Sequence, residues 1–262
     1  MMKIRLHIRN LILNFISINS KVSNNVHILN GHFIQAVLNN NSNIFFENFI
    51  KELTNIFEVI DLRSAVKLIN NKHECEKPKV SITFDDGFEE CYTIMLPVLE
   101  KYNIKATFFI NPMSVENQNS FFTKSFISNN LQVDLQKRIM NWDMLKEIKD
   151  LGHIVGSHTY SHANLKYLTQ SKLQYEIVDS KVVIESKLNT DCDFFAFPFG
   201  NDNYFDEKAI SLVTKNYKFG FTSGLYGKYY YKNNKQLLSR RHFECDIPLK
   251  HLLYFTSKKR KY

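Results

Sequence analysis

Residues 79–88 read KVSITFDDGF, and the organisation of the whole chain can be worked out from this stretch. Apolar and small polar side chains alternate along residues 80–84, and this period-two pattern predicts a buried β-strand. Asp85, Asp86 and Gly87 follow at once and predict a sharp turn where the strand ends. Adjacent carboxylates repel each other unless a cation or a proton lies between them. The stretch is therefore either a solvated turn or half of a site that needs partners from elsewhere in the chain.

Strand-like and helix-like segments alternate over most of the 262 residues. The predicted strands are residues 26–30, 80–84, 105–110, 153–157, 194–197, 218–222 and 237–243. The predicted helices are residues 44–57, 61–69, 89–102, 142–151, 172–188, 206–216 and 247–255. Such alternation is typical of parallel βαβ units, and seven or eight units favour a (β/α) barrel or a distorted one. In these barrels the chemistry lies at the carboxyl ends of the strands.

The composition is that of a folded protein, with 44% hydrophobic residues, 22 Phe and 13 Tyr. The four cysteines form no CxxC motif, which predicts free thiols in a reducing compartment. Residues 1–20 carry a short apolar run that Asn14 interrupts, a pattern of an amphipathic or buried helix rather than of a signal peptide. No stretch approaches the ~20 apolar residues of a membrane span. We expect a cytoplasmic protein, with export left open.

The net charge of +8 favours anionic partners such as nucleic acid, phosphate-bearing substrates or an acidic membrane surface. Part of this charge is concentrated in a basic tail, residues 258–262. The remaining basic residues are scattered, as in a Lys-rich composition that has no anionic partner. No basic helix is interleaved with stacking aromatic residues, so no nucleic-acid partner is expected. Peripheral contact with an acidic membrane remains an expectation.

A second polar cluster follows the predicted strand 153–157, where His158 and His162 are four residues apart. On a helical turn this spacing places both imidazoles on one face, where they can bind one cation. Alone, such a pair is usually solvated. With one carboxylate it forms a 2-His-1-carboxylate set that suits Zn²⁺ or a similar divalent ion. If Asp86 is that ligand, Asp85 remains as a base beside activated water, which predicts metal-assisted hydrolysis.

Three segments resemble the successive motifs of polysaccharide deacetylases, the NodB-like group of carbohydrate esterase family 4. They are TFDDG at 83–87, SHTYSHANL at 157–165 and FPFG at 197–200. Their order and context match over about residues 26–245. The resemblance implies a single-domain, distorted (β/α)7-type barrel that removes N-acetyl, or occasionally O-acetyl, groups from sugars. It also implies one divalent metal ion, Zn²⁺ by expectation, with Co²⁺, Ni²⁺ or Mn²⁺ as alternatives.

The resemblance further implies a role for each matching position. Asp85 would be the general base. The metal ligands would be Asp86, His158 and His162. The backbone N–H of Phe199 would help to stabilise the tetrahedral oxyanion, and Pro198 would fix the turn that presents it to the substrate.

The chain departs from the family pattern at two places. Ala196 stands where the third motif often begins with an Arg that pairs with the catalytic Asp. We expect Arg240 to orient Asp85 instead and to temper its pKa, the alternative being a surface basic pair. The general acid is often a His in a late Leu-x-His motif, for which this chain shows no clear equivalent. The candidates are His242, then His251, with His32 either near the site or a core histidine.

Residues 114–139 are polar and irregular, and we expect them to cover the barrel mouth and shape the substrate groove. Several aromatic side chains could stack on a sugar, although core packing is the favoured interpretation. They are Phe121, Phe122, Phe126, Tyr226 and Tyr229–Tyr231. The expected divisions are an N-terminal helical extension (1–25), the barrel (26–257) and the basic tail (258–262).

The combined prediction is a metal-dependent hydrolase that deacetylates an N-acetylated sugar of a surface glycan or of its nucleotide- or lipid-linked precursor. One alternative is a glycan-binding barrel with a degenerate site, which Ala196 and the missing acid favour and the complete Asp and His set opposes. A second, suggested only by charge, is a metal-dependent phosphodiesterase. A third is a hydrolase of another small acyl group, such as formyl, or of a cyclic imide.

Overall fold

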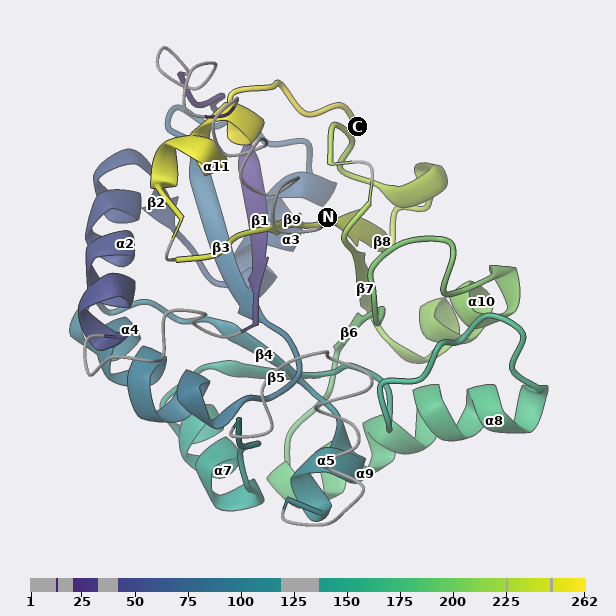
Figure 1. Cartoon of the computed structure of the whole chain (residues 1–262). Helices are drawn as coiled ribbons and strands as arrows, with labels where there is room; N and C mark the ends of the chain where they lie inside the picture. The colour runs from purple at the N-terminus through teal and green to yellow at the C-terminus, as the bar shows by residue number, and fades with distance from the viewer. Residues whose placement is uncertain (1–12, 14–20, 33–41, 119–136, 225, 246) are drawn as a thin grey trace, which may run out of the picture.

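The computed structural model describes residues 13, 21–32, 42–118, 137–224, 226–245 and 247–262, and its strands curl into a nearly closed barrel surrounded by helices (Figure 1). The sheet order is β8-β7-β6-β5-β4-β3-β1-β9, with β2 paired to β3, and these pairings are parallel. The strands are β1 (Val26–Gly31), β2 (Glu58–Val59), β3 (Lys79–Phe84), β4 (Thr107–Ile110), β5 (Ile154–Ser157), β6 (Phe194–Ala196), β7 (Phe219–Thr222), β8 (Leu237–Ser239) and β9 (Arg241–His242). The barrel predicted from alternating segments is confirmed.

Helices occupy the connections and lie outside the ring (Figure 1). They are α2 (Ser42–Ile56), α3 (Leu62–Asn70), α4 (Leu96–Lys101), α5 (Pro112–Glu116), α7 (Trp142–Asp150), α8 (Gln170–Gln174), α9 (Ser180–Leu188), α10 (Glu207–Asn216) and α11 (Leu249–Thr256), with a 3-10 turn at Tyr231–Asn233. Asp61 caps α3, because its side chain accepts a bond from the Ser64 N–H. Two predicted helices contain π-helical turns, Cys91–Met95 and Tyr175–Asp179. The first lies just before Pro97, which cannot donate a helical hydrogen bond.

The register of the strands fixes which side chains face the barrel interior. Asn30 of β1 pairs with Thr83 of β3, and paired residues of parallel strands share a face. Asp85, two residues after Thr83, lies on that face too. The other face packs on the helices, as the ring of Phe84 lies 6.1 Å from that of Phe46 in α2. Asp85 therefore points into the barrel.

The last strand closes the ring, and it is not the single piece predicted over residues 237–243. It is interrupted at Arg240, so that β8 pairs with β7 while β9 pairs with β1. Arg240 thus lies where the chain crosses from one edge of the sheet to the other. If β8 and β9 are counted as one strand, the described ring contains seven: β1, β3, β4, β5, β6, β7 and β8/β9. This agrees with the expected (β/α)7-type barrel.

Arg260 bridges β1 and β8 at this seam of the barrel. Its guanidinium donates to the backbone oxygen of Val26 at 3.3 Å and to that of Ser239 at 2.8 Å. The side chain is buried, although the sequence places it in the basic tail. The charge of Arg260 is therefore enclosed by the barrel rather than presented at the surface.

Several expectations fall on residues outside the described ranges. Of the predicted extension 1–25, only Leu13 and residues 21–25 are described, and most of the segment 114–139 is not. The three phenylalanines of that segment, Phe121, Phe122 and Phe126, lie outside the described residues. Tyr229–Tyr231 are buried, as core packing predicted. Among the described helices, none combines the length and hydrophobicity needed to span a bilayer.

Candidate active site

A cavity of about 410 Å³ opens among the carboxyl ends of the barrel strands. It is lined by Asn30, His32, Asp85, Asp86, His158, His162, Phe197, Phe199, Gly200, Ser223 and His242. The turn after β3 and the loop after β5, far apart in sequence, thus contribute to one site. The two predicted polar clusters are brought together.

Three of these side chains converge as a metal site would require. Asp86 Oδ1 lies 3.5 Å from His158 Nε2 and 3.4 Å from His162 Nε2. One ligand-type atom of each residue lies within 4.8 Å of the others. Ligands about 2.0–2.2 Å from a tetrahedral Zn²⁺ lie about 3.3 Å from one another, so this spacing suits one divalent ion. Asp86 Oδ1 is also buried without a hydrogen-bond partner among the described residues, which is costly unless a cation binds it.

The loop that carries the two histidines is not the helical turn that their spacing suggested, and this part of the prediction is wrong. Thr159 and His162 have positive φ angles of 68° and 58°, which no helical turn contains. The Asn111 side chain donates to the Thr159 carbonyl at 3.1 Å. Glu176 accepts bonds from the Ser161 N–H at 2.9 Å and from its hydroxyl at 2.6 Å. These contacts fold the loop back so that the imidazoles still meet.

His158 is oriented for ligation by its second ring nitrogen. Its Nδ1 lies 2.8 Å from the Ala196 carbonyl, and this contact requires the tautomer with the proton on Nδ1. The lone pair of Nε2 is then directed toward Asp86. Burial lowers the pKa of His158, and burial together with the neighbouring histidines lowers that of His162 further. Both imidazoles are therefore neutral near pH 7, the form that binds metal ions.

Asp85 is excluded from this cluster and is paired with Arg240. The guanidinium donates to both carboxylate oxygens at 2.7 Å and to Thr83 Oγ1 at 3.0 Å. Arg240 is only 1% exposed, so the surface alternative is wrong and the expected contact is present. Burial is the largest single influence on Asp85 and opposes its ionisation, but Arg240, together with His158 and His32, holds the pKa of Asp85 well below its usual range.

Asp86 has the opposite tendency. Burial, and then the charge of Asp85, raise the pKa of Asp86 well above its ordinary value. The two adjacent carboxyl groups thus have different partners, a guanidinium for Asp85 and imidazoles for Asp86. A divalent cation at Asp86 would favour its ionised form and relieve the repulsion between the pair.

The turn after β6 forms one wall of the cavity. Phe199 and Gly200 have positive φ angles of 61° and 70°. The ring of Phe199 lies 4.7 Å from that of His162 and 4.3 Å from that of Tyr204. Phe199 therefore reaches the cavity, whereas Pro198, which precedes it in the turn, is not among the residues that line it.

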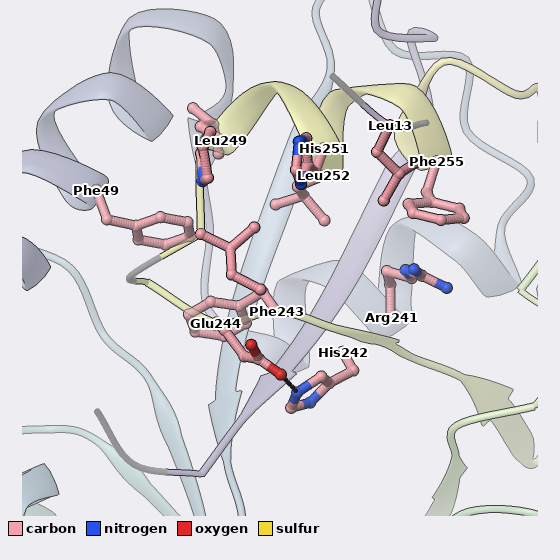
Figure 2. A pocket seen from close by; sticks show the side chains of 12 residues that line it. Leu13, Phe49, Arg241, His242, Phe243, Glu244, Leu249, His251, Leu252 and Phe255 are labelled. Atoms are coloured by element: carbon pink, nitrogen blue, oxygen red, sulfur yellow. Dashed lines mark hydrogen bonds and ion pairs between the residues drawn. The ribbon is translucent and has the colours of Figure 1, made fainter. Parts of the chain in front are cut away.

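Two of the three candidate acids lie in the cavity and one does not. His32 and His242 both line the cavity, with ring centroids 5.2 Å apart. His32 Nε2 lies 3.9 Å from Asp86 Oδ2, whereas His242 Nε2 contacts Glu244 at 3.3 Å. His251, on α11, lines a separate cavity of about 70 Å³, whose lining also includes His242 (Figure 2). The lower-ranked candidate His251 is thus removed from the site.

Some residues that shape the site belong to no motif in the sequence. Asn111 directly follows the predicted strand 105–110, and Asn30 ends the predicted strand 26–30. Both are polar residues at the carboxyl end of a predicted strand, the criterion that identified Asp85. Glu176 lies within a predicted helix, where no sequence signal separates it from a solvated carboxylate.

Comparisons with known proteins agree with this geometry. A family model described as polysaccharide deacetylase matches residues 72–219. The Bacillus subtilis (strain 168) protein YxkH is 29% identical over 161 residues, which cover 61% of this chain and 50% of that protein. The peptidoglycan-N-acetylglucosamine deacetylase of Bacillus cereus is 28% identical over 125 residues, covering 47% of this chain and 37% of the relative. The chain thus spans half or less of the length of these relatives.

Solved structures share the fold. The Streptococcus pyogenes deacetylase PplD, determined in complex with acetate, aligns with a TM-score of 0.70 and covers 88% of this chain and 97% of its own. The sequences are 20% identical in that alignment. At this identity the likeness concerns the barrel itself.

Proposed function

The chain belongs to the polysaccharide deacetylase family, and from this premise we propose that it is a metal-dependent hydrolase that removes an N-acetyl group from a sugar. The sugar is part of a surface glycan or of its nucleotide- or lipid-linked precursor. The observation that carries the proposal is the different pairing of two adjacent buried aspartates. Asp86 faces two imidazoles, whereas Asp85 faces Arg240.

The residues divide the work of amide hydrolysis between them. Asp86, His158 and His162 would hold a divalent cation, with Zn²⁺ expected, which would supply Lewis acidity toward the acyl carbonyl and toward a water molecule. Asp85 accepts the proton of the attacking water. Arg240 fixes both oxygens of Asp85 and keeps the group ionised, so that it can accept a proton at neutral pH. The same contact makes Asp85 a weaker base, which suits a water whose acidity is already increased.

The backbone N–H of Phe199 is proposed to donate to the oxyanion that develops as water adds to the carbonyl. Two features support this role. Phe199 lines the cavity, and its ring contacts His162, so its backbone lies near the metal cluster. Pro198 is proposed to restrict the preceding backbone and so preserve the turn.

The departing nitrogen needs a proton, and His242 is the residue that the sequence favours for this step. His32 lies in the same wall, with Nε2 3.9 Å from Asp86 Oδ2, while Nε2 of His242 lies 3.3 Å from Glu244. Burial lowers the pKa of His32 to about 4, so near pH 7 it lacks the labile proton of an imidazolium. We therefore propose His242 as the acid, with His32 as its neighbour.

A degenerate glycan-binding barrel is the rival that Ala196 suggested. The Arg240–Asp85 pair weakens that rival, because it supplies the cation that Ala196 cannot supply. The complete set of Asp86, His158 and His162 weakens it further.

The proposal is tested by comparing Asp85→Asn with Asp86→Asn. Acetate release would be measured on N-acetylated oligosaccharides and nucleotide sugars, and bound metal by elemental analysis. Because only Asp86 is a proposed ligand, Asp85→Asn should keep its metal yet lose about 10²–10⁴-fold in kcat. Asp86→Asn should lose both metal and activity.

Chelation of the wild-type protein should abolish acetate release, and added Zn²⁺ should restore it. Full activity in Asp85→Asn, or activity that survives chelation, would contradict the proposed mechanism. Stoichiometric metal in Asp86→Asn would contradict the proposed ligand set.

A further inference from the structure

Asn30 lies in the wall of the catalytic cavity but has no role in the hydrolysis steps proposed for Asp85, Arg240 and the metal ligands. Its backbone pairs with Thr83 on one side and with His242 on the other, so the three side chains share the interior face of the barrel. Asn30 is 3% exposed, and it lines the cavity of about 410 Å³. A carboxamide is thus buried in the wall of the cavity that contains the proposed catalytic residues.

The Oδ1 atom of Asn30 has no hydrogen-bond partner among the described residues. The neighbouring Thr83 is fully engaged by comparison, since its hydroxyl donates to the Leu29 carbonyl at 2.8 Å and accepts from Arg240 at 3.0 Å. A buried acceptor without a partner is destabilising, and such groups are rare in folded proteins. Because Asn30 lines the cavity, a ligand bound there can supply the missing donor.

The neighbours of Asn30 indicate which part of a substrate it meets. His242 is its partner across the β1–β9 pairing, and His32 lies two residues further along the same face. These are the two candidates for protonating the departing nitrogen. The metal-binding histidines come from the loop after β5, which β3 and β4 separate from β1 in the ring. Asn30 therefore lies on the side of the leaving group.

We propose that Asn30 accepts a hydrogen bond from the N–H of the scissile amide and so selects N-acyl over O-acyl substrates. This inference rests on the proposed function. The amide N–H is the one donor that every N-acyl substrate brings to this position, and an acetate ester lacks it. A site that contains a buried acceptor discriminates against a ligand without the matching donor, because the acceptor is then left unpaired.

The test compares kcat/KM for acetate release from two matched glucosides, one 2-acetamido and one 2-O-acetyl. Asn30→Leu, similar in size but unable to accept, should lower kcat/KM on the amide at least about tenfold and change it less than about twofold on the ester. Its melting temperature should stay the same or rise, because an unpaired buried polar group is replaced by an apolar one. Asn30→Thr, which keeps an acceptor, should retain a preference for the amide.

Thr107→Val is the matched control. Thr107 is buried, its hydroxyl also has no partner among the described residues, and it does not line the cavity. Its substitution should leave the amide-to-ester ratio unchanged. Equal losses on both substrates in Asn30→Leu would overturn the inference and leave the proposed function standing. A metal-loaded wild-type protein that released acetate from neither substrate would overturn the proposed function itself.

Discussion

Two buried arginines, Arg240 and Arg260, meet the barrel at the same seam and do different things there. Arg240 follows Ser239 at the end of β8, and Arg260 donates to the carbonyl of Ser239. They are 1% and 2% exposed. Burial of a guanidinium is costly in both places, so each must be compensated. The way in which each is compensated separates the catalytic region from the structural one.

Arg240 is compensated by a carboxylate. It forms two bonds with Asp85, a group that lines an open cavity and can exchange a proton. Arg260 is compensated by the backbone and by aromatic rings. It donates to the carbonyls of Tyr226, Val26, Lys228 and Ser239, and it lies between the rings of Tyr226 and Tyr229 at 4.5 and 4.4 Å. No ion pair of Arg260 is found within the described part of the chain. Buried charge is therefore a sign of chemistry only where its partner is titratable and reachable by solvent.

Replacing each arginine by methionine should separate the two roles, and this is the largest effect expected. Arg240→Met leaves Asp85 buried without its partner, which should cost about 3–5 kcal/mol of unfolding free energy and about 100-fold in kcat/KM. The acid limb of its pH–rate profile should move to higher pH, because the pKa of Asp85 rises once the guanidinium is gone. Arg260→Met strands several backbone acceptors and should cost about 3 kcal/mol, with activity per folded molecule unchanged.

Urea unfolding and kinetics at several pH values would measure both variants. The division into a catalytic Arg240 and a structural Arg260 is wrong if Arg260→Met loses as much activity per folded molecule as Arg240→Met. It fails equally if the pH profile of Arg240→Met coincides with that of the wild type.

Much of the barrel and of its site could be predicted from the sequence. The alternation of strand-like and helix-like segments predicts the fold. The rule that function lies at the carboxyl ends of strands identifies Asp85 and His158 from the sequence alone. Arg240 could be assigned to Asp85 because a missing cation at Ala196 had to be replaced. These features depend on local periodicity or on the pairing of an arginine with the first aspartate that the family resemblance implies.

What could not be predicted depends on contacts between distant segments. The conformation of the His158–His162 loop is set by Glu176 and Asn111, which no local pattern links to it. The burial of Arg260 in a stretch of four basic residues depends on the gap between β1 and β8. From composition alone, such a stretch is expected to be a solvated tail. No local pattern shows that the backbone carbonyls at the seam of the barrel need hydrogen-bond donors.

A second, smaller contrast concerns histidine at the seam. His27 is fully buried, with Nδ1 2.5 Å from the Tyr226 hydroxyl. Burial, and then the charge of Arg260, lower the pKa of His27 from 6.5 to about 3. Between these values the unfolded chain binds a proton that the folded protein does not. The contribution of His27 is therefore present above pH 6.5 and is lost as the pH falls, by up to about 1.4 kcal/mol per pH unit.

His27→Gln should accordingly flatten the acid side of the stability profile by as much as one proton. Urea unfolding at pH 7, 6, 5 and 4 would measure the slope. His73→Gln, at an exposed position, is the control and should leave the slope unchanged. Parallel profiles for His27→Gln and wild type would show that the seam does not exclude the proton.

The smallest expected effect concerns Tyr167, which follows a residue that is bonded to the loop behind the cavity wall. Tyr167 is 86% exposed and has a φ of 71°, a conformation that costs energy for a bulky residue. Its neighbour Lys166 bonds through its N–H to the Tyr204 carbonyl at 2.9 Å, and Tyr204 stacks on Phe199 in the cavity wall. An exposed aromatic ring on a segment joined in this way to the cavity wall offers a surface for the apolar face of a second sugar.

Tyr167→Ala should raise KM for a long N-acetylated oligosaccharide about 3- to 10-fold, since a single ring contact is worth about 1 kcal/mol, and leave kcat unchanged. A monosaccharide substrate, which does not extend past the cavity, should show no change. Tyr262→Ala provides the counterpart at the seam: that ring is 45% exposed and packs 4.7 Å from Tyr229. It should alter stability and not KM. If both substitutions changed KM alike, Tyr167 would not be a glycan contact, because an effect shared with a residue at the seam reports on the fold as a whole.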